Sequence, residues 1–280
     1  MFETAYRDLT ESEVEIYQTE GVVLVKQCVD PSWVERMGIA IDRQLSNPGK
    51  WVQDTNPGSN NKRFLHDRYL WPTENEFRNY VFNSGVAELA AQAMRSSSVR
   101  IYFDHVFVKE PNTDEEFFWH QDLPYRPFSG SQICSVWLSL TDADLDSSGL
   151  EFVRGSHMWG KWYKPVISGG EDTELGKWIS ASEGEEIPDF NQQRDRYEFL
   201  SFETRAGDAV IFNTAIAHTS HANRSPYRCR VALSTRWLGD DARWDPRLGT
   251  DPIVTQDDVA LKPGAPISDD DVFPIVWRAE

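Results

Sequence analysis

The sequence predicts a mainly β protein with supporting helices, built as a β-sandwich or as a jelly-roll barrel. Between residues 99 and 237, short runs of β-branched and aromatic residues alternate with turns rich in Gly, Pro, Asn, Asp and Ser. The strand–helix–strand alternation that builds a parallel nucleotide-binding sheet is missing from this stretch. The helical patterns lie in the N-terminal third, about residues 1–98, and are expected to support the barrel from outside.

Recognisable start and stop signals bound the expected helices. Thr10 followed by Glu13 forms a capping box that begins a helix, and Gly21 ends it. Asp30-Pro31 is an N-cap followed by a proline at the first helical position, and one apolar face continues from there. The expected helices cover about 10–21, 31–46 and 84–94, and residues 50 to the early 60s are expected to form a loop.

The expected strands are clusters of β-branched and aromatic residues between turn signals. In chain order they are 22–29, 99–109, 117–121, 132–140, 149–153, 197–204, 208–212 and 228–237.

Two long segments lie outside this strand pattern. Residues 158–195 interrupt it with a polar insert, and a loop of that length in a compact domain is usually functional, so we expect a lid. The tail, residues 238–280, is rich in Asp and Pro and is expected to wrap the surface. No composition shift marks a boundary, which predicts a single domain over residues 1–280.

Charge and composition limit the kinds of binding partner that the protein can have. The 280 residues carry a net charge of −17, which argues against binding to nucleic acid or to anionic lipid, since both require concentrated Lys and Arg. The first residues lack a basic and apolar leader, and the three scattered cysteines suit reduced thiols. We therefore expect a cytoplasmic protein that acts on a small molecule, away from membranes and nucleic acids. The oligomeric state stays open.

One histidine is followed two residues later by a carboxylate, in His120-Gln121-Asp122. On a strand, residues i and i+2 face the same way, so this pair can chelate one ion. A ferrous centre that also binds a keto acid and oxygen needs two imidazoles and one carboxylate on one face. The candidates for the third ligand are His66, His105, His157, His218 and His221.

His218 is placed well for this role, because it follows a predicted strand and precedes another. The following strand carries Arg228 and Arg230, which supply a cation for a distal carboxylate. These segments resemble the phytanoyl-CoA dioxygenase family of iron and 2-oxoglutarate oxygenases, strongly over residues 100–237 and weakly before. The matching motifs, in family order, are Trp119 to Tyr125, Ser135-Val136-Trp137, Gly149 to His157, Gly207-Asp208, and His218-Thr219-Ser220 with Asn223 and Arg230.

The resemblance implies a double-stranded β-helix, the jelly-roll barrel of cupin-like proteins, and it implies roles for single residues. His120, Asp122 and His218 match the Fe(II) ligands, with His221 as the rival of His218. Arg230 matches the arginine that pairs with the far carboxylate of the co-substrate 2-oxoglutarate, and Arg228, of the same strand parity, is the alternative. Trp137, Ser220 and His105 are expected to line the co-substrate pocket, and His157 is expected to be structural.

The resemblance further implies an enzyme that uses O2 and 2-oxoglutarate to oxidise an unactivated C–H bond, with release of succinate and CO2. In halogenating relatives a small residue replaces the carboxylate, so Asp122 favours hydroxylation or another oxidative outcome over halogenation. A cupin-type metal-dependent isomerase or hydrolase, which needs no Arg230, and a non-catalytic binding protein are the alternatives. Within the insert, Trp159, Trp162 and Tyr163 are expected either to form a wall over the substrate or to pack the insert onto the barrel.

Overall fold

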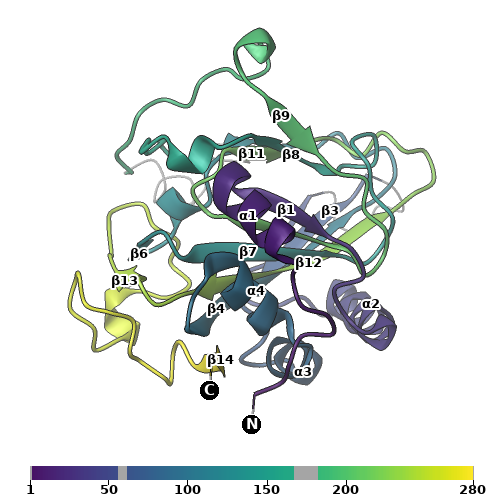
Figure 1. Ribbon diagram of the computed structural model, residues 1–280. Helices are drawn as coiled ribbons and strands as arrows, with labels where there is room; N and C mark the ends of the chain where they lie inside the picture. Colours follow the sequence, from purple (N-terminus) through teal and green to yellow (C-terminus); the bar gives the residue numbers. More distant parts are fainter. Residues whose placement is uncertain (1, 56–61, 167–181, 280) are drawn as a thin grey trace.

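Two antiparallel β-sheets face each other in the computed structural model, and helices cover the outer face of the larger sheet (Figure 1). The structure describes residues 2–55, 62–166 and 182–279. Within these ranges no helix combines the length and the apolar composition that a membrane span needs.

Each sheet joins strands that lie far apart in the sequence. In the larger sheet the order is β1-β10-β7-β12-β4-β3-β2, with β14 paired to β4, and in the smaller sheet it is β5-β11-β8-β9. This arrangement confirms the predicted double-stranded β-helix. The larger sheet comprises β1 (Val22–Val25), β2 (Gln53–Thr55), β3 (Phe64–Arg68), β4 (Ser98–Lys109), β7 (Ile133–Ser139), β10 (Ala209–Asn213), β12 (Arg230–Leu238) and β14 (Ile275–Arg278). The smaller sheet comprises β5 (Phe117–His120), β8 (Leu150–Val153), β9 (Phe199–Ser201) and β11 (His218–Ser220), and a separate pair joins β6 (Phe128–Ser129) to β13 (Arg243–Trp244).

The first two helices begin and end at the capping signals of the sequence. The Thr10 side chain accepts a hydrogen bond from the Glu13 amide, and Gly21 ends the helix at φ 83°, where glycine is favoured. Asp30 caps the second helix by accepting from the Ser32 amide. The helices are α1 (Glu11–Glu20), α2 (Pro31–Ser46), α3 (Asn75–Asn83) and α4 (Val86–Met94).

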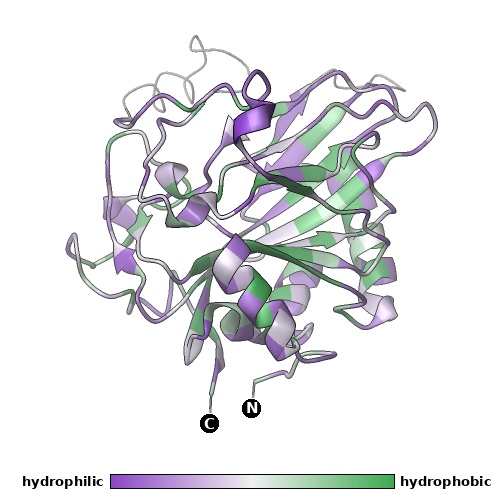
Figure 2. Cartoon of the chain, turned by 45° about the horizontal axis from the view of Figure 1, so that its top comes forward, coloured by the Kyte–Doolittle hydropathy of each residue, from purple (hydrophilic) through white to green (hydrophobic). Residues whose placement is uncertain are grey.

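Alternation along the central strands separates two layers of core. On β7, Val136 and Leu138 belong to the cluster that packs against the helices, whereas Trp137 points to the space between the sheets with Val210 and Phe212. Every residue of β7 is buried, because both faces of the sheet are covered. Hydrophobic residues accordingly concentrate along the strands in the middle of the molecule, and hydrophilic ones on the outer loops (Figure 2).

Two local expectations were wrong and the helix α3 was missed, each for a physical reason. The loop expected from residue 50 into the early 60s holds β2 and precedes β3, whose run of polar side chains hides its strand pattern. In β3 the buried Asp67 carboxylate accepts from the Gln44 side chain and the Gly49 amide. The helix α3 has no side-chain N-cap, so its start carries no signal. The first strand ends at Val25 because the chain turns at Gln27, where φ is 48°.

The tail contributes to the core as well as covering the sheet. Nine of its apolar residues pack in a second buried cluster with Tyr102, Phe103 and Phe128. The strand β14 then extends the larger sheet beside β4. The tail residues in this cluster are Leu238, Ala242, Trp244, Ile253, Val254, Val259, Leu261, Ile267 and Phe273.

Asp104 on β4 predicts a measurable pH dependence of stability. One of its oxygens accepts the amides of Leu70 and Trp71, while the other has no hydrogen-bond partner among the described residues. Burial raises the pKa of this carboxyl to about 6. The folded state therefore holds the proton more tightly than the unfolded chain, and stability is lost as the pH rises toward 6. We expect Asp104→Asn to gain about 2 kcal/mol relative to wild type between about pH 4.5 and 7.

The measurement is the free energy of unfolding in urea for both proteins at each pH. Asparagine keeps an oxygen for the two amides, so the variant tests the charge and little else. A difference between the two proteins that stays constant across this pH range would contradict the prediction.

Candidate metal centre

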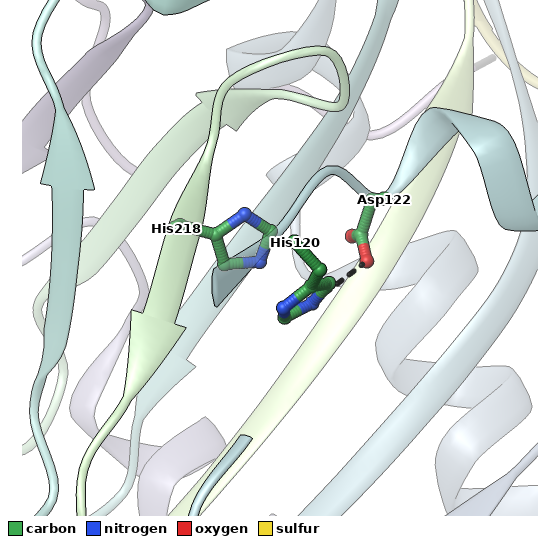
Figure 3. A group of neighbouring side chains, drawn as sticks. All are labelled: His120, Asp122 and His218. Carbon is green, nitrogen blue, oxygen red and sulfur yellow. Dashed lines mark ion pairs between the residues drawn. The ribbon is translucent and has the colours of Figure 1, made fainter. Parts of the chain in front are cut away.

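His120, Asp122 and His218 converge at one end of the smaller sheet. β5 ends at His120 and β11 begins at His218, and the two residues lie opposite each other in the antiparallel pair. One ligand atom from each side chain lies within 4.8 Å of the others, and in the described ranges this is the one such group of His, Cys, Asp and Glu. The three side chains point toward one another (Figure 3).

Asp122 reaches the site through a turn, which corrects the expectation that strand parity aligns it with His120. The strand stops at His120, and Asp122 has helical dihedrals, φ −70° and ψ −38°, at the start of a short 3-10 turn. Gln121 fixes this turn, because its amide donates to the Ala215 and Lys161 carbonyls and accepts from the Tyr163 amide.

Hydrogen bonds set the imidazoles for metal binding. The Nδ1 atom of His120 lies 2.7 Å from the Phe118 carbonyl oxygen, and that of His218 lies 3.1 Å from the Ile216 carbonyl oxygen. A carbonyl only accepts, so each Nδ1 carries the proton and each Nε2 keeps a free lone pair. Burial lowers the pKa of His218 to about 3 and also lowers the pKa of His120. Both rings are therefore neutral near pH 7, as metal ligation requires.

Asp122 is ionised despite its burial. Burial disfavours the charge, but Arg236 and Arg126 outweigh it and lower the pKa of the carboxyl. The Arg126 Nη2 atom lies 3.6 Å from the Asp122 Oδ1 atom, and the Arg236 Nη2 atom lies 3.6 Å from its Oδ2 atom. The Ser135 hydroxyl donates to the same Oδ2 atom at 3.2 Å. Two neutral imidazoles and one carboxylate form the donor set that suits Fe(II) with positions left open.

Arg230 lies in the same cavity with unsatisfied donors. It begins β12, its residue is 1% exposed, and its Nη2 contacts the hydroxyls of Ser148 and Ser220 at 3.2 and 3.3 Å. Its Nε and Nη1 atoms are buried without a hydrogen-bond partner among the described residues. Burial lowers the pKa of the guanidinium to about 10. A buried cation with two such unsatisfied nitrogens is costly, so the site fits a carboxylate ligand.

The structure separates Arg230 from its alternative, Arg228. The Arg228 side chain is 43% exposed, pairs with Asp144 at 3.1 Å and does not line the cavity. His221, the rival of His218, bonds the Glu151 carboxylate at 3.0 Å, outside the metal group. His157 faces the Gln18 carbonyl in another part of the surface.

The other expected pocket residues line the cavity. Trp137 lies on β7, with the Arg230 guanidinium carbon 5.8 Å from its ring centre, and Ser220 lies on β11. His105 on β4 also lines the cavity, but its Nε2 lies 3.0 Å from the Nδ1 of His66.

The described parts of the insert dock beside the cavity, and residues 167–181 of the expected lid lie outside the described residues. Trp159 packs on Phe190 and Tyr197, and the Trp162 ring lies under the Arg247 guanidinium. Neither these two rings nor Tyr163 line the cavity, whereas Val166 does. The packing interpretation of the three aromatic residues therefore holds for the described part.

Sequence reasoning missed four charged residues of the cavity. Arg236 follows Arg230 by an even number of strand positions, so strand parity was a usable signal for it. Arg126 comes four residues after Asp122 in the 3-10 turn region, where no regular period applies. The full set of missed charged residues is Arg68, Arg126, Arg236 and Asp251.

The structure thus combines a jelly roll with two histidines, one carboxylate and a buried arginine in one cavity, as the resemblance seen in the sequence implies. The family model of phytanoyl-CoA dioxygenase (PhyH) matches residues 17–231. The chain therefore belongs to the phytanoyl-CoA dioxygenase family, which confirms the resemblance seen in the sequence.

Among curated proteins, phytanoyl-CoA dioxygenase 1 of Oryza sativa subsp. japonica is 27% identical over 158 residues. The match covers 56% of this chain, and the chain spans about half the length of that relative, 51%.

Solved structures share the fold across nearly the whole chain. The non-haem α-ketoglutarate-dependent carbocyclase SnoK from nogalamycin biosynthesis has a TM-score of 0.72 at 20% identity, covering 98% of this chain and 99% of its own. The epimerase SnoN, solved with Fe3+, α-ketoglutarate and nogalamycin RO, has a TM-score of 0.70 at 20% identity, covering 95% and 98%. EctD from S. alaskensis, solved with 2-oxoglutarate and 5-hydroxyectoine, has a TM-score of 0.67 at 14% identity, covering 92% and 85%.

Proposed function

We propose that this protein is an Fe(II)- and 2-oxoglutarate-dependent dioxygenase that hydroxylates an unactivated C–H bond of a small molecule. The observation that carries the proposal is the buried Arg230 in the same cavity as His120, Asp122 and His218, because its Nε and Nη1 atoms have no hydrogen-bond partner among the described residues. A keto diacid that binds a metal at one end needs a cation at the other. Family membership supports the same activity.

The residues have distinct tasks in this proposal. His120, Asp122 and His218 would hold Fe(II), and Arg230 would bind the far carboxylate of 2-oxoglutarate, as would the hydroxyl of Ser220 beside it. When bound, Fe(II), 2-oxoglutarate and O2 supply the oxidising power, with release of succinate and CO2. Trp137, Phe212 and Phe107 form apolar walls that keep water out of the cavity.

The proposal names the substrate only by its chemical class, which is either a lipid-like acyl compound or a natural product. Two structural neighbours are described as a carbocyclase and an epimerase from nogalamycin biosynthesis, so oxidation by this fold ends in more than one product type. Hydroxylation is the finer part of the proposal, and Asp122 supports it over halogenation because the carboxylate occupies the position that a halide would need.

Slow release of succinate tests the activity without knowledge of the substrate. Purified protein incubated with Fe(II), ascorbate, O2 and 2-oxoglutarate is expected to form succinate, with one 2-oxoglutarate consumed per succinate formed. The rate should fall to the protein-free background in Asp122→Ala. A panel of acyl and natural-product substrates should raise it.

The alternatives predict different results in the same assay. A cupin-type isomerase or hydrolase would bind metal, form no succinate and retain activity in Arg230→Ala. A non-catalytic binding protein would bind metal or ligand without turnover. Metal binding without any succinate formation across the substrate panel would therefore contradict the proposed function.

A further inference from the structure

Three arginines and one aspartate form a second charged group in the cavity, here named the arginine cluster: Arg68, Arg126, Arg236 and Asp251. They come from four separate places, namely the end of β3, the segment after the 3-10 turn, β12 and the tail. All four line the cavity that contains the metal ligands. Their side chains are at most 10% exposed.

Asp251 neutralises only part of this charge. Its Oδ2 atom accepts from Arg68 Nη1 at 2.9 Å and from Arg126 Nη1 at 2.7 Å, so one carboxylate serves two guanidinium groups. Arg236 approaches Asp122 at 3.6 Å, but Asp122 is the carboxylate assigned to the metal. Arg126 and Arg236 both contact the Phe103 ring, with their guanidinium carbons 4.6 and 4.9 Å from its centre.

Charge counting over the cavity leaves an excess of positive charge. Among the described lining residues, Arg68, Arg126, Arg230 and Arg236 are positive, and Asp122 and Asp251 are negative. The excess is two positive charges. Fe(II) and the 2-oxoglutarate dianion cancel each other, so the excess remains after both have bound.

The two cavity histidines outside the metal group, His66 and His105, do not change this count. Burial, reinforced by Arg236, lowers the pKa of His105 well below its usual value, and burial with Arg68 does the same for His66. Both rings are neutral near pH 7 and add no charge. His105 still offers its Nδ1 atom, which is buried without a partner among the described residues.

Unused donors lie on the same side chains. The Nε atoms of Arg68, Arg126 and Arg236 are buried and have no hydrogen-bond partner among the described residues. A buried guanidinium with free N–H groups is costly unless an acceptor binds it, and an anionic acceptor forms the strongest such bond. The geometry of guanidinium matches the planar or tetrahedral oxygens of carboxylate and phosphate groups.

We infer that the substrate carries an oxyanion, a carboxylate or a phosphate group, which binds the arginine cluster while Arg230 holds 2-oxoglutarate. This inference rests on the proposed function for the use of Asp122, Arg230 and the metal. It deepens that function, because it places the substrate's charged end beside the metal ligands and selects acids from among acyl compounds and natural products.

Binding of matched probes tests this inference without turnover. Protein loaded with Fe(II) and saturating 2-oxoglutarate under anaerobic conditions is titrated calorimetrically with phenylacetate, benzylphosphonate and phenylacetamide. The two anions are expected to bind about tenfold or more tightly than the neutral amide. Comparison of the two anions distinguishes a carboxylate site from a phosphate site.

Two variants with opposite expected signs separate charge from structural damage. Arg68→Gln should weaken anion binding about tenfold, whereas Asp251→Asn removes the internal counter-charge and should strengthen it. Misfolding would weaken binding in both. Arg243→Gln, on the exposed residue of β13, is the matched control and should leave binding unchanged.

The same titrations keep the two proposals apart, since Fe(II) and 2-oxoglutarate binding are measured first. If both bind and the amide binds as tightly as the anions, the inference is overturned while the proposed function stands. If neither binds but the anion preference persists and depends on Arg68, the proposed function fails and the oxyanion site stands. Anion binding that weakens in Asp251→Asn as much as in Arg68→Gln also overturns the inference.

Discussion

His218→Ala is expected to lower the affinity for Fe(II) by more than about 100-fold and to abolish succinate release. Loss of a residue that only supports a metal ligand typically costs about 10–100-fold, and loss of a ligand itself should cost more. The His218 ring is stacked against Phe152 and buried beside Phe212, and among the described residues no further His, Cys, Asp or Glu joins the metal group. The measurement is anaerobic Fe(II) titration, with Co(II) as a spectroscopic substitute, followed by the succinate assay.

His221→Ala is the matched control, because His221 lies three residues further on and was the rival ligand. Its ring pairs with Glu151, and its side chain is 25% exposed. Removing it should leave metal affinity within about twofold of wild type, since the ring lies outside the metal group. Equal loss of metal binding in both variants would indicate general damage. Loss in His221→Ala alone would overturn the assigned ligand set.

The order of the motifs in the sequence correctly predicted that His120 and His218 lie close together, because the two residues lie on neighbouring strands. His218 lies opposite His120 in the β5–β11 pair, so a short strand on each side suffices to bring them together. Strand parity was the wrong reason for placing Asp122 in the site. A turn fixed by Gln121 directs its carboxylate there. The residue types were readable from the sequence, while the backbone that aims them was not.

The arginine cluster shows what sequence patterns do not contain. Arg68 lies on β3, a strand whose polar residues break the apolar alternation that marks strands, since Asp67 is buried through hydrogen bonds and not through hydrophobicity. Asp251 lies in a tail that reads as a surface loop but reaches the cavity through the second buried cluster. Both positions depend on long-range packing, and no periodicity in the sequence records such contacts.

Arg230→Met is expected to raise the dissociation constant for 2-oxoglutarate by about 100-fold or more while leaving Fe(II) affinity unchanged. Removing one partner of a buried, charge-assisted pair costs about 2–5 kcal/mol, and each 1.4 kcal/mol is about tenfold in affinity. Methionine keeps much of the apolar stem, so the walls formed with Trp137 and Phe107 stay filled. The measurement is calorimetric titration of the metal-loaded protein with 2-oxoglutarate in the absence of O2.

Arg228→Met is the matched control for this variant and decides between the two arginines of the strand. Arg228 is exposed and paired with Asp144, so its loss should change 2-oxoglutarate affinity by less than about twofold. Stability gives a second, independent contrast. Because the apo protein buries Arg230 without full hydrogen bonding, Arg230→Met should unfold at the same urea concentration as wild type or at a higher one. A variant that keeps normal 2-oxoglutarate affinity would remove Arg230 from the co-substrate site, and a normal affinity together with a loss in Arg228→Met would transfer the role to Arg228.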